Sequence, residues 1–512
     1  MKRTLLLAAL MTAASMAFSQ PGRLASDLEK LDRYYQRVLD EWNLPGMAVG
    51  IIYDGELVFS QGYGLKEAGG QDVPDGNTLF AIASNTKAFT ASMLAMLVEE
   101  GRIGWDDKVK DHLPYFELFN HYVTNETTIL DLLSHRVGLG TFSGDVIWYK
   151  SDIPAEQVLR NARHLPPAFG FRSGYGYSNL MYLAAGEVIE KVTGKSWMEN
   201  ARERILIPLG MDRTILSPSD LEAMGNFASP HALFDGVNTP IDWEDWENVA
   251  PMGGLISSVN DVAQWMILNM NGGVWNGDTL LSPRSINRLW TPHNPMAVDH
   301  GRAQDFGRNF NAYGLGWGLG DYHGTLSVGH TGGYDGMISE VRMLPKKKIG
   351  VVVLTNGVKS PIGPVTNYTL ETLLGLEPRD WSAEALPRVN RRWAQEDPRI
   401  TAIREARISG TQPSLALEAY AGTYESAIYG KLFVRLEAGQ LQLDFGHSAD
   451  LAAELRHWHH DVWEIRWKKP HAFFGFGTVA FSLDNKGKVT GMDLEVPNRD
   501  IFFEELKPVR ID

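Results

Sequence analysis

The chain has 512 residues, of which 44% are hydrophobic and 21% are charged, and its formal net charge is −14 at pH 7. This length is enough for two or three domains, while the negative charge argues against nucleic acid or an anionic membrane as a partner. The chain has no cysteine, which excludes both a disulfide framework and a lipid-anchored N-terminal cysteine.

The first twenty residues have the pattern of a cleavable targeting segment. Lys2 and Arg3 form a positive start, residues 5–11 and the following alanines form an apolar run, and residues 17–19 (Ala-Phe-Ser) are a small-x-small cleavage site. We therefore expect a signal peptide over residues 1–19 and a periplasmic or secreted protein. The alternative is an N-terminal membrane anchor, which the short, small-residue-rich run disfavours. No later stretch is apolar for long enough to span a bilayer.

The segment after the predicted signal peptide indicates a helix followed by a hairpin. Residues 24–42 favour a helix, which the Asn-Leu-Pro-Gly sequence at 43–46 ends. Residues 47–53 and 57–62 are strand-like and flank an Asp-Gly pair, a common hairpin turn. A strand pair is therefore expected before the first chemical motif.

That motif consists of Ser84 and Lys87, three residues apart, where a small-residue run gives way to helix-favouring sequence at 88–100. Positions i and i+3 of a helix share one face, so the Ser84 hydroxyl and the Lys87 ammonium can meet. A serine hydroxyl needs a neighbouring base or cation to act as a nucleophile at neutral pH, and a helix N-terminus favours an alkoxide. The alternative is a chance Ser-x-x-Lys match, with an exposed serine and a solvated lysine.

From residue 103 to about residue 273 the pattern is mainly helical, with long loops. Tyr177 and Asn179 lie two apart in a glycine-rich turn before a strong helix at 180–192, so both side chains can face a cleft. The alternative for Tyr177 is a tyrosine packed under a loop. His135 follows a short helix at 128–133, and we interpret it as a capping or packing residue rather than a catalytic one.

Strand character returns in the later part of the chain, after a helix expected at 260–269. The expected strands span residues 313–319, 324–330, 337–344 and 349–355. A glycine-rich run between the second and third strands begins with His330, Thr331, Gly332 and Gly333. Glycine at a strand end lets a substrate approach the main chain closely.

The composition and the predicted secondary structure both change after residue 377. Residues 378–412 have low apolar density and clustered charges, and we interpret them as a helical or extended connector. Residues 413–512 have short alternating strands with glycine and asparagine turns, which predict a small β-barrel or sandwich. Three histidines in this region lack a cysteine or acidic partner at ligand spacing, so we interpret them as surface polar residues and expect no metal; they are His457, His459 and His460.

Three short motifs follow one another in the chain: Ser84-x-x-Lys87, Tyr177-Ser178-Asn179 and His330-Thr331-Gly332. In this order they resemble the serine β-lactamase and penicillin-binding-protein superfamily. The Tyr-x-Asn form resembles the class C β-lactamases and their carboxypeptidase, D-aminopeptidase and esterase relatives. The resemblance covers about residues 25–376, with supporting matches at 132–139, 208–211 and 253–255. The β-rich tail resembles a lipocalin-like domain appended to such hydrolases.

The resemblance implies an α/β (α+β) fold with a five-stranded antiparallel sheet flanked by helices and joined to a helical subdomain. The sheet strands would come from both ends of that segment, which agrees with strands on either side of the helical region. A small all-β, barrel-like domain would follow. The expected division is a signal peptide at 1–19, a hydrolase domain at 20–377, a connector at 378–412 and a β domain at 413–512.

The resemblance also implies roles for the motif residues. Ser84 would attack a carbonyl and form an acyl-enzyme, with the backbone N–H groups of Ser84 and Gly333 as the oxyanion hole. Tyr177 would act as the general base, provided that nearby Lys87 lowers its pKa from about 10. Asn179 would hydrogen-bond the amide of the substrate, and water would then deacylate the enzyme. No metal or other cofactor is required.

The third motif, residues 330–333, would bind the substrate, but it begins with His330 where true β-lactamases and most penicillin-binding proteins have lysine. Histidine is mostly neutral above about pH 6.5. This departure favours peptidase, amidase or esterase relatives over an efficient β-lactamase. Arg172 or another cation could restore the binding of a substrate carboxylate.

The sequence therefore predicts an exported serine hydrolase that acts on amide, peptide or ester bonds of a peptide or other small molecule. The resemblance implies the β-lactamase/D-Ala-D-Ala carboxypeptidase type, with D-amino-acid peptidase, carboxypeptidase or esterase activity. One alternative is a penicillin-binding sensor or a true β-lactamase with slow or modest turnover. Another is a non-catalytic scaffold whose β-tail does the binding, against which the intact Ser84, Lys87 and Tyr177 count.

Overall fold

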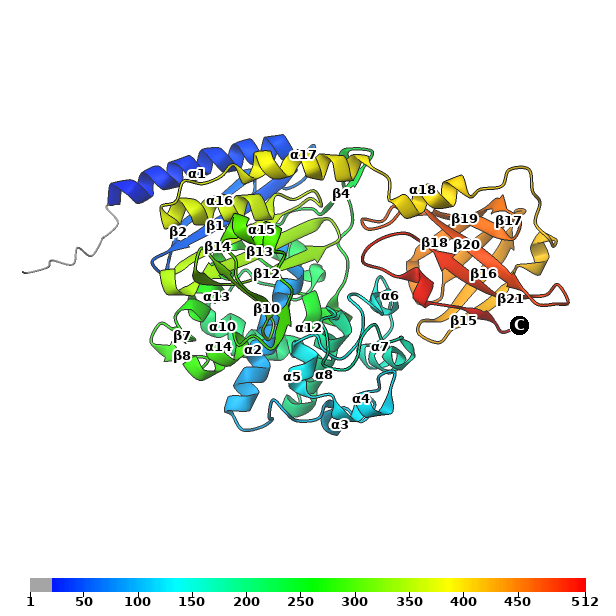
Figure 1. Cartoon of the computed structure of the whole chain (residues 1–512), viewed down its shortest axis with the longest axis horizontal. Helices are drawn as coiled ribbons and strands as arrows, with labels where there is room; N and C mark the ends of the chain where they lie inside the picture. Colours follow the sequence, from blue (N-terminus) through cyan, green and yellow to red (C-terminus); the bar gives the residue numbers. More distant parts are fainter. Residues whose placement is uncertain (1–20) are drawn as a thin grey trace, which may run out of the picture.

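The computed structural model describes residues 21–512, so the predicted signal peptide lies outside the described residues. A central sheet with helices on both faces takes up most of this length, and a β-barrel follows it (Figure 1). Within residues 21–512, no helix is both long and apolar enough to cross a membrane.

The central sheet has eight antiparallel strands in the order β2-β1-β14-β13-β12-β11-β10-β9. Their bounds are β1 (Gly46–Tyr53), β2 (Glu56–Gly64), β9 (Asn294–Met296), β10 (Asn311–Tyr313), β11 (Gly318–Tyr322), β12 (Thr325–Tyr334), β13 (Met337–Leu344) and β14 (Ile349–Thr355). The first five strands of this order form the expected antiparallel sheet. The last three extend it, so the mixed α/β fold is confirmed with a wider sheet than predicted.

Strands β1 and β14 form the buried centre of the sheet. Almost every residue of β1 and all of β14 are buried. The sequence of β14 is Ile-Gly-Val-Val-Val-Leu-Thr, a run rich in β-branched residues that suits a strand covered on both faces. Met47 of β1 pairs with Thr355 of β14, which joins the two ends of the domain.

Helices cover both faces of this sheet (Figure 1). One face carries α1 (Pro21–Trp42), α16 (Ile362–Leu374) and α17 (Trp381–Ala394), and the other carries α2 (Thr86–Glu99) and α13 (Val259–Met270). The hydroxyls of Tyr35 and Thr369 join α1 to α16 at 2.5 Å. Trp42 Nε1 donates to Ser382 Oγ at 2.8 Å, so α17, which was expected in the connector, packs onto the sheet domain.

The chain between β2 and β9 forms the helical part of the domain. Its other helices are α3 (Val109–His112), α4 (His121–Glu126), α5 (Ile129–Leu133), α6 (Asp145–Trp148), α7 (Ala155–Asn161), α8 (Asn179–Thr193), α9 (Trp197–Ala201), α10 (Ile207–Leu209), α11 (Leu221–Met224), α12 (Ala250–Gly253) and α14 (Pro283–Leu289). Its strand pairs are β3 (Phe80–Ala81) with β6 (Ile256–Ser257), β4 (His231–Phe234) with β5 (Val237–Pro240), and β7 (Val274–Trp275) with β8 (Asp278–Thr279). α15 (His300–Phe306) follows β9. The helices predicted at 180–192 and 260–269 correspond to α8 and α13.

The region predicted as one strand at 313–319 forms a hairpin instead, with β10 and β11 on either side of a turn. Gly316 in this turn has a φ of +77°. A Cβ at Gly316 would lie 2.8 Å from backbone atoms of Lys87 and Ala88, so the turn packs directly on α2. The prediction was wrong because apolar residues continue to alternate across the turn, which hides the reversal of the chain.

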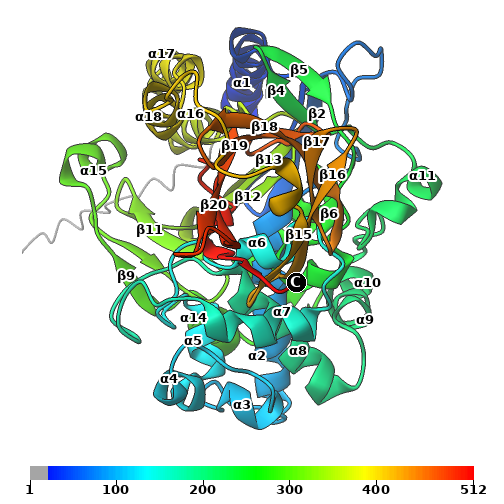
Figure 2. The same cartoon turned by 90° about the vertical axis from the view of Figure 1, so that its right-hand side faces the viewer.

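The tail forms a closed barrel of antiparallel strands, which confirms the predicted all-β domain (Figures 1 and 2). Its strands are β15 (Gly422–Ser426), β16 (Gly430–Glu437), β17 (Gln440–Phe445), β18 (Ser448–His459), β19 (Val462–Trp467), β20 (Gly477–Leu483), β21 (Val489–Glu495) and β22 (Val509–Arg510). The helix α18 (Pro398–Glu405) leads from α17 into the barrel.

The barrel contacts the helical part of the sheet domain, which lies behind it in Figure 2. Glu505 accepts hydrogen bonds from Ser143 Oγ at 2.6 Å and from the Gly144 N–H at 2.7 Å. His447 Nδ1 lies 2.8 Å from Asp152 Oδ1. These contacts hold the barrel beside α6, with Glu505 at the N-terminal end of that helix.

Candidate active site

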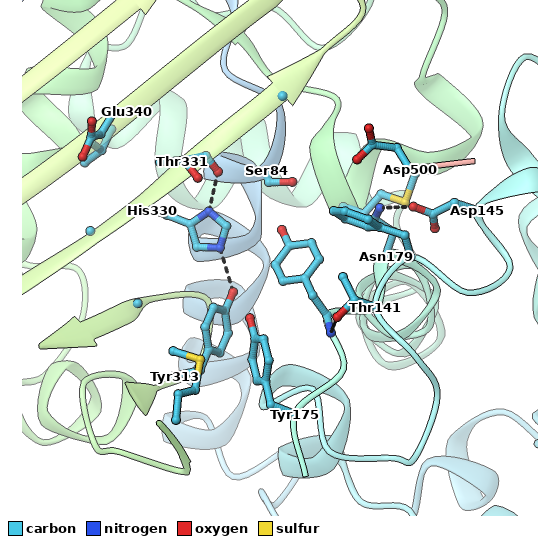
Figure 3. Close-up of a pocket in the computed structure, with 18 of the residues that line it drawn as sticks. Ser84, Thr141, Asp145, Tyr175, Asn179, Tyr313, His330, Thr331, Glu340 and Asp500 are labelled. Carbon is cyan, nitrogen blue, oxygen red and sulfur yellow. Dashed lines mark hydrogen bonds between the residues drawn. The ribbon is translucent and has the colours of Figure 1, made fainter. Parts of the chain in front are cut away.

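Ser84 lies at a tight turn between β3 and α2 (Figure 3). It is the middle residue of a 3₁₀ turn, Ala83–Asn85, that runs directly into α2. Ala83 is fully buried with a φ of +46°, a left-handed conformation that costs a non-glycine residue about 1–2 kcal/mol. This turn places the Ser84 hydroxyl at the N-terminus of α2, where the helix dipole favours a developing alkoxide.

Lys87 is fully buried on the first turn of α2 and approaches Ser84. Its Nζ lies 3.0 Å from Ser84 Oγ, 2.7 Å from Asn179 Oδ1 and 2.6 Å from the carbonyl oxygen of Met252. Burial lowers the pKa of Lys87 to about 7, although the carboxyl group of Asp145 opposes the change. The predicted contact with Ser84 is present, and Lys87 is able to accept a proton near neutral pH.

Tyr177 reaches the same point from the loop before α8. Its ring lies against that of His135, with a centroid distance of 4.4 Å, and Lys87 Nζ lies 4.9 Å from the Tyr177 ring centroid. His135 Nδ1 accepts a hydrogen bond from the Ser178 N–H. His135 is therefore the packing residue that the sequence predicts, and it supports the loop that carries Tyr177.

The protonation of Tyr177 differs from the sequence expectation. Its hydroxyl is buried and has no hydrogen-bond partner among the described residues. Burial raises its pKa well above the usual value, and the neighbouring Ser84 hydroxyl offsets only part of this effect. The expectation that Tyr177 is a phenolate is therefore wrong. Burial disfavours the charged forms of both groups, so Lys87 does not bring the pKa of Tyr177 below its usual value. Tyr177 is a phenol at neutral pH and is suited to donate a proton.

Asn179, the first residue of α8, links Lys87 to a carboxyl group that lies outside the three motifs. Its Oδ1 accepts the hydrogen bond from Lys87, and its Nδ2 donates to Asp145 Oδ2 at 2.6 Å. Trp148 Nε1 also donates to Asp145, at 2.9 Å. The Asn179 amide, which was expected to bind the amide of the substrate, is thus hydrogen-bonded at both ends within the protein.

Asp145 is the residue of this network that sequence reasoning missed. It is only 3% exposed, and burial raises its pKa to about 7. The available signal was an acidic residue directly after Gly144, which has a φ of +83° and precedes α6. A glycine followed by an acidic residue indicates the start of a helix. It does not indicate that the Asp145 carboxyl group contacts Asn179, because that contact forms only in the folded chain.

His330 lies on β12, with its ring centroid 6.0 Å from that of Tyr177; Figure 3 shows its hydrogen bonds to Thr331 and Tyr313. Its Nδ1 is 2.6 Å from the carbonyl oxygen of Thr331, so this nitrogen carries the proton, and Nε2 accepts from the Tyr313 hydroxyl at 2.8 Å. Burial and the charge of Lys87 lower the pKa of His330 to about 4. His330 is therefore neutral near pH 7 and acts as a hydrogen-bonding group rather than as a cation.

The glycines after His330 bring β12 close to the Ser84 turn. A Cβ at Gly332 would lie 2.1 Å from the carbonyl oxygen of Ile82, so only glycine fits there. Thr331 and Gly333 are exposed and line the cavity beside Ser84. From His330 to Tyr334, β12 pairs only with β13 among the described strands, because β11 ends its pairing at Gly329. This half of β12 therefore presents a free backbone edge to the cavity.

Ser84 opens into a cavity of about 630 Å³ that includes residues from both parts of the protein. The helical part supplies an aromatic wall of Trp148, Tyr149, Tyr177 and Trp246. The barrel supplies Phe473, Asp500 and Ile501, and Figure 3 shows Asp500 on the side of the cavity where Asp145 lies. Sequence reasoning did not find these barrel residues, because no local pattern places a loop of the tail beside Ser84.

Arg172 does not supply the cation that the third motif lacks. It makes a salt bridge of 2.6 Å to Asp131 and is absent from the cavity lining. Among the described residues, no group of three or more histidine, cysteine, aspartate or glutamate side chains is placed to hold a metal ion. The groups that face the Ser84 hydroxyl are the Lys87 amine and the Tyr177 phenol.

Comparison with known proteins fits this arrangement. The beta-lactamase family model matches residues 31–374, which include every motif residue. The chain belongs to the beta-lactamase family. A second model, for a domain of unknown function (DUF3471), matches residues 406–508, which include most of the barrel. The predicted superfamily resemblance is confirmed over the sheet domain.

Several known proteins are similar to most of this chain. Unguisins hydrolase ungD' of Aspergillus campestris is 31% identical over 426 residues, which cover 78% of this chain and 76% of the relative. Protein flp of Staphylococcus aureus (strain MW2) is 27% identical over 351 residues, or 65% of this chain and 64% of flp. The octameric penicillin-binding protein homologue of Pyrococcus abyssi is 24% identical, with a TM-score of 0.62 over 92% of this chain and 98% of that chain, and supports the fold.

Proposed function

We propose that this member of the beta-lactamase family is a serine hydrolase that cleaves amide, peptide or ester bonds through an acyl-enzyme on Ser84. The observation that carries the proposal is the contact of 3.0 Å between Lys87 Nζ and Ser84 Oγ, made by a lysine whose pKa is about 7. A neutral amine at this distance is a competent general base for a serine hydroxyl. The name of the Aspergillus campestris relative, a hydrolase, agrees with this class.

Acylation begins when Ser84 Oγ attacks the carbonyl carbon and its proton passes to Lys87 Nζ. The backbone N–H groups of Ser84 and Gly333 are proposed to hold the oxyanion, a contribution that is commonly worth about 10²–10³ in rate per donor. When the carbonyl forms again, the leaving amine or alcohol takes a proton from the Tyr177 phenol. The Tyr177 oxygen regains its proton from the Lys87 ammonium, so both groups return to their starting forms.

Deacylation repeats these steps with water in place of Ser84. Lys87 takes a proton from the attacking water, directly or through Tyr177, and the Ser84 oxygen leaves the acyl carbon and is protonated. Hydrolysis thus consumes one water and leaves every protein group unchanged. The chain Lys87–Asn179–Asp145 keeps the amine of Lys87 oriented during both halves.

The lining of the cavity supports a proposal for the class of substrate. An aromatic wall and a free strand edge at 330–334 suit an extended peptide or an acyl chain that hydrogen-bonds along β12. The neutral His330 gives no fixed charge for a β-lactam carboxylate, so we expect ester and amide turnover to exceed β-lactam turnover. We also propose that residues 1–19 direct export of the enzyme.

The test is covalent labelling with a fluorescent fluorophosphonate, combined with a panel of nitrophenyl esters, amino-acid anilides and a cephalosporin. Ser84→Ala should abolish labelling and turnover, while Ser92→Ala should keep both. Ser92 is a matched control because it lies buried on α2 and its hydroxyl has no partner among the described residues. Labelling that persists in Ser84→Ala would refute the assignment. A burst without turnover would indicate the penicillin-binding sensor instead.

The pH dependence provides a second test. Lys87 must be in its uncharged form to accept the proton of Ser84. For an ester without charge, kcat/KM should therefore rise with pH and level off above about pH 7, the pKa of Lys87. At pH 5 the rate should be about 100-fold below the plateau. Lys87→Arg keeps a permanent positive charge, and it should remove activity at every pH between 5 and 9.

A further inference from the structure

Most of the charged side chains that line the cavity are paired with each other or with neighbours. Asp145 accepts hydrogen bonds from Asn179 and Trp148. Glu340 pairs with Arg342 and accepts from Thr366 Oγ1 at 3.1 Å. The negative charge of Glu340 and the positive charge of Arg342 therefore largely cancel at the sheet side of the cavity.

Arg308 is the exception at the sheet side. Among the described residues it makes neither a hydrogen bond nor an ion pair, and its Nε is buried without a partner. The guanidinium lies beside the glycine backbone of β11, since a Cβ at Gly320 would be 3.5 Å from Arg308 Nε. Half burial and the positive charge of Arg342 lower its pKa, yet a guanidinium remains protonated in proteins. The guanidinium lies over the Phe306 ring, 5.6 Å from its centroid, and the charges of Asp321 and Glu340 act on it without accepting a hydrogen bond. Arg308 thus offers unpaired N–H donors to the cavity.

Ser84 and Arg308 line the same cavity. Half of the cavity lining on β11 and β12 is glycine (Gly318, Gly320, Gly329 and Gly333), and the other half consists of Leu319, Ser327, His330 and Thr331. Because β11 leaves β12 after Gly329, the cavity continues past the free edge of β12 towards Arg308 and Glu340. Figure 3 shows Glu340 and Asp500 on opposite sides of Ser84.

The opposite side of the cavity would not attract an anion. Asp500 lines it from the barrel, and no side chain donates a hydrogen bond to its carboxyl group among the described residues. Burial raises the pKa of Asp500, and the charges of Arg499 and Arg392 offset part of this effect. A carboxylate on the substrate would therefore meet a carboxyl group on the barrel side and the Arg308 guanidinium on the sheet side. This asymmetry fixes the direction in which an anionic substrate lies across Ser84.

We propose that Arg308 binds a carboxylate of the substrate, so that the enzyme prefers acyl compounds with an anionic group on the sheet side of Ser84. This inference rests on the proposed serine hydrolase function. A guanidinium can hold a carboxylate through two parallel N–H···O bonds. Arg308 would thereby supply the charge recognition that the neutral His330 does not provide, at a greater distance from the scissile bond.

The experiment compares the full-length enzyme on matched nitrophenyl esters. One series consists of mono-nitrophenyl esters of dicarboxylic acids of increasing chain length, each with a free terminal carboxylate. The other series carries a terminal carboxamide in place of the carboxylate. For the wild type, kcat/KM should favour the carboxylate at one preferred chain length. Equal values, or a preference for the carboxamide at every length, would overturn the inference without any variant.

Arg308→Gln should raise KM for the best carboxylate ester by about 10- to 100-fold, the usual effect of losing a charged hydrogen-bonded pair. Its carboxamide partner should change by less than about twofold, and Arg308→Lys should recover part of the loss. Arg33→Gln is the matched control, since Arg33 is exposed on α1 and the change in net charge is the same. An equal effect of Arg308→Gln on both esters would contradict charge recognition.

The same data separate the two proposals. If no ester is turned over in a manner that depends on Ser84, the hydrolase function itself fails. If the carboxamide esters are turned over through Ser84 and carboxylate esters gain nothing from Arg308, only the subsite is wrong. High salt should weaken the carboxylate preference without affecting the carboxamide series.

Discussion

The link between Lys87 and Asp145 leads to a quantitative prediction for Asp145→Asn. The two groups are joined through Asn179 by hydrogen bonds of 2.7 Å and 2.6 Å. When ionised, Asp145 stabilises the ammonium form of Lys87 and so raises its pKa. Removing this charge should make Lys87 easier to deprotonate, and the acid limb of the rate profile should move to lower pH.

The size of the effect follows from the distance. The amide of Asn179 adds ~2.3 Å between its oxygen and nitrogen, so the charges are at most ~7.6 Å apart along the path. At an effective dielectric constant of about 20 their interaction is about 2 kcal/mol, which corresponds to about 1.5 in pKa. Because the pKa of Asp145 is itself about 7, this group is only partly ionised along the acid limb. The midpoint should therefore fall from about pH 7 by at most about 1.5 in Asp145→Asn.

The assay is kcat/KM for a neutral nitrophenyl ester between pH 4.5 and 8.5, with melting temperature measured in parallel. Asparagine has one acceptor oxygen, so either Asn179 or Trp148 loses its partner and some stability is lost, about 1–3 kcal/mol. Trp148→Phe is the control, because it removes only the hydrogen bond from the indole. Because the Trp148 hydrogen bond lowers the pKa of Asp145, its loss should lower stability and move the midpoint of the limb less than the loss of the carboxylate does.

Two results would contradict the reasoning. An acid limb that stays near pH 7 in Asp145→Asn would mean that the Asp145 charge is not felt at Lys87. A limb that moves to higher pH would mean that the titrating base is a different group. If both variants shift the limb equally, the effect comes from a disturbed α6 rather than from the lost charge.

Further predictions concern packing around the site. Gly332→Ala should destabilise the fold by about 3 kcal/mol and abolish fluorophosphonate labelling, because its Cβ would meet the carbonyl oxygen of Ile82 at 2.1 Å. Gly333→Ala is its control, since the nearest atom lies at 3.8 Å, and it should fold normally by circular dichroism. Glu505→Ala should lower the melting temperature by weakening the contact with Gly144, at a cost of about 1–3 kcal/mol. A chain that ends after α18 should still fold and label at Ser84, with altered KM values because the barrel wall is missing.

Much of the fold can be predicted from the sequence because its signals are local. The strands expected at 337–344 and 349–355 match β13 and β14 in full, since apolar runs there are bounded by clear turns. Ser84 and Lys87 meet as predicted because residues three positions apart on a helical turn share a face. The error at 313–319 arose where apolar residues alternate across a turn, at Gly316, that packs on α2.

The electrostatics of the site could not be predicted in the same way. The sequence places a tyrosine beside a lysine, which favours a phenolate, but burial of both groups keeps Tyr177 a phenol and lowers the pKa of Lys87 to about 7. Asp145 and Arg308 belong to no motif, and their roles depend on loops that meet only in the folded chain. Local patterns identify the reacting groups, whereas their protonation depends on the surrounding protein.

The pairing of β1 with β14 also determines when during synthesis this enzyme can become active. Met47 and Thr355 are neighbours in the sheet but lie about 300 residues apart in the chain, and contacts over such separations form late in folding. The Ser84 turn emerges from the ribosome long before β12, which forms the opposite wall of its cavity. A nascent chain that stops short of β12 therefore carries Ser84 and Lys87 without the strand edge and glycines that complete the site. The proposed acyl transfer should therefore begin only after synthesis has passed β14.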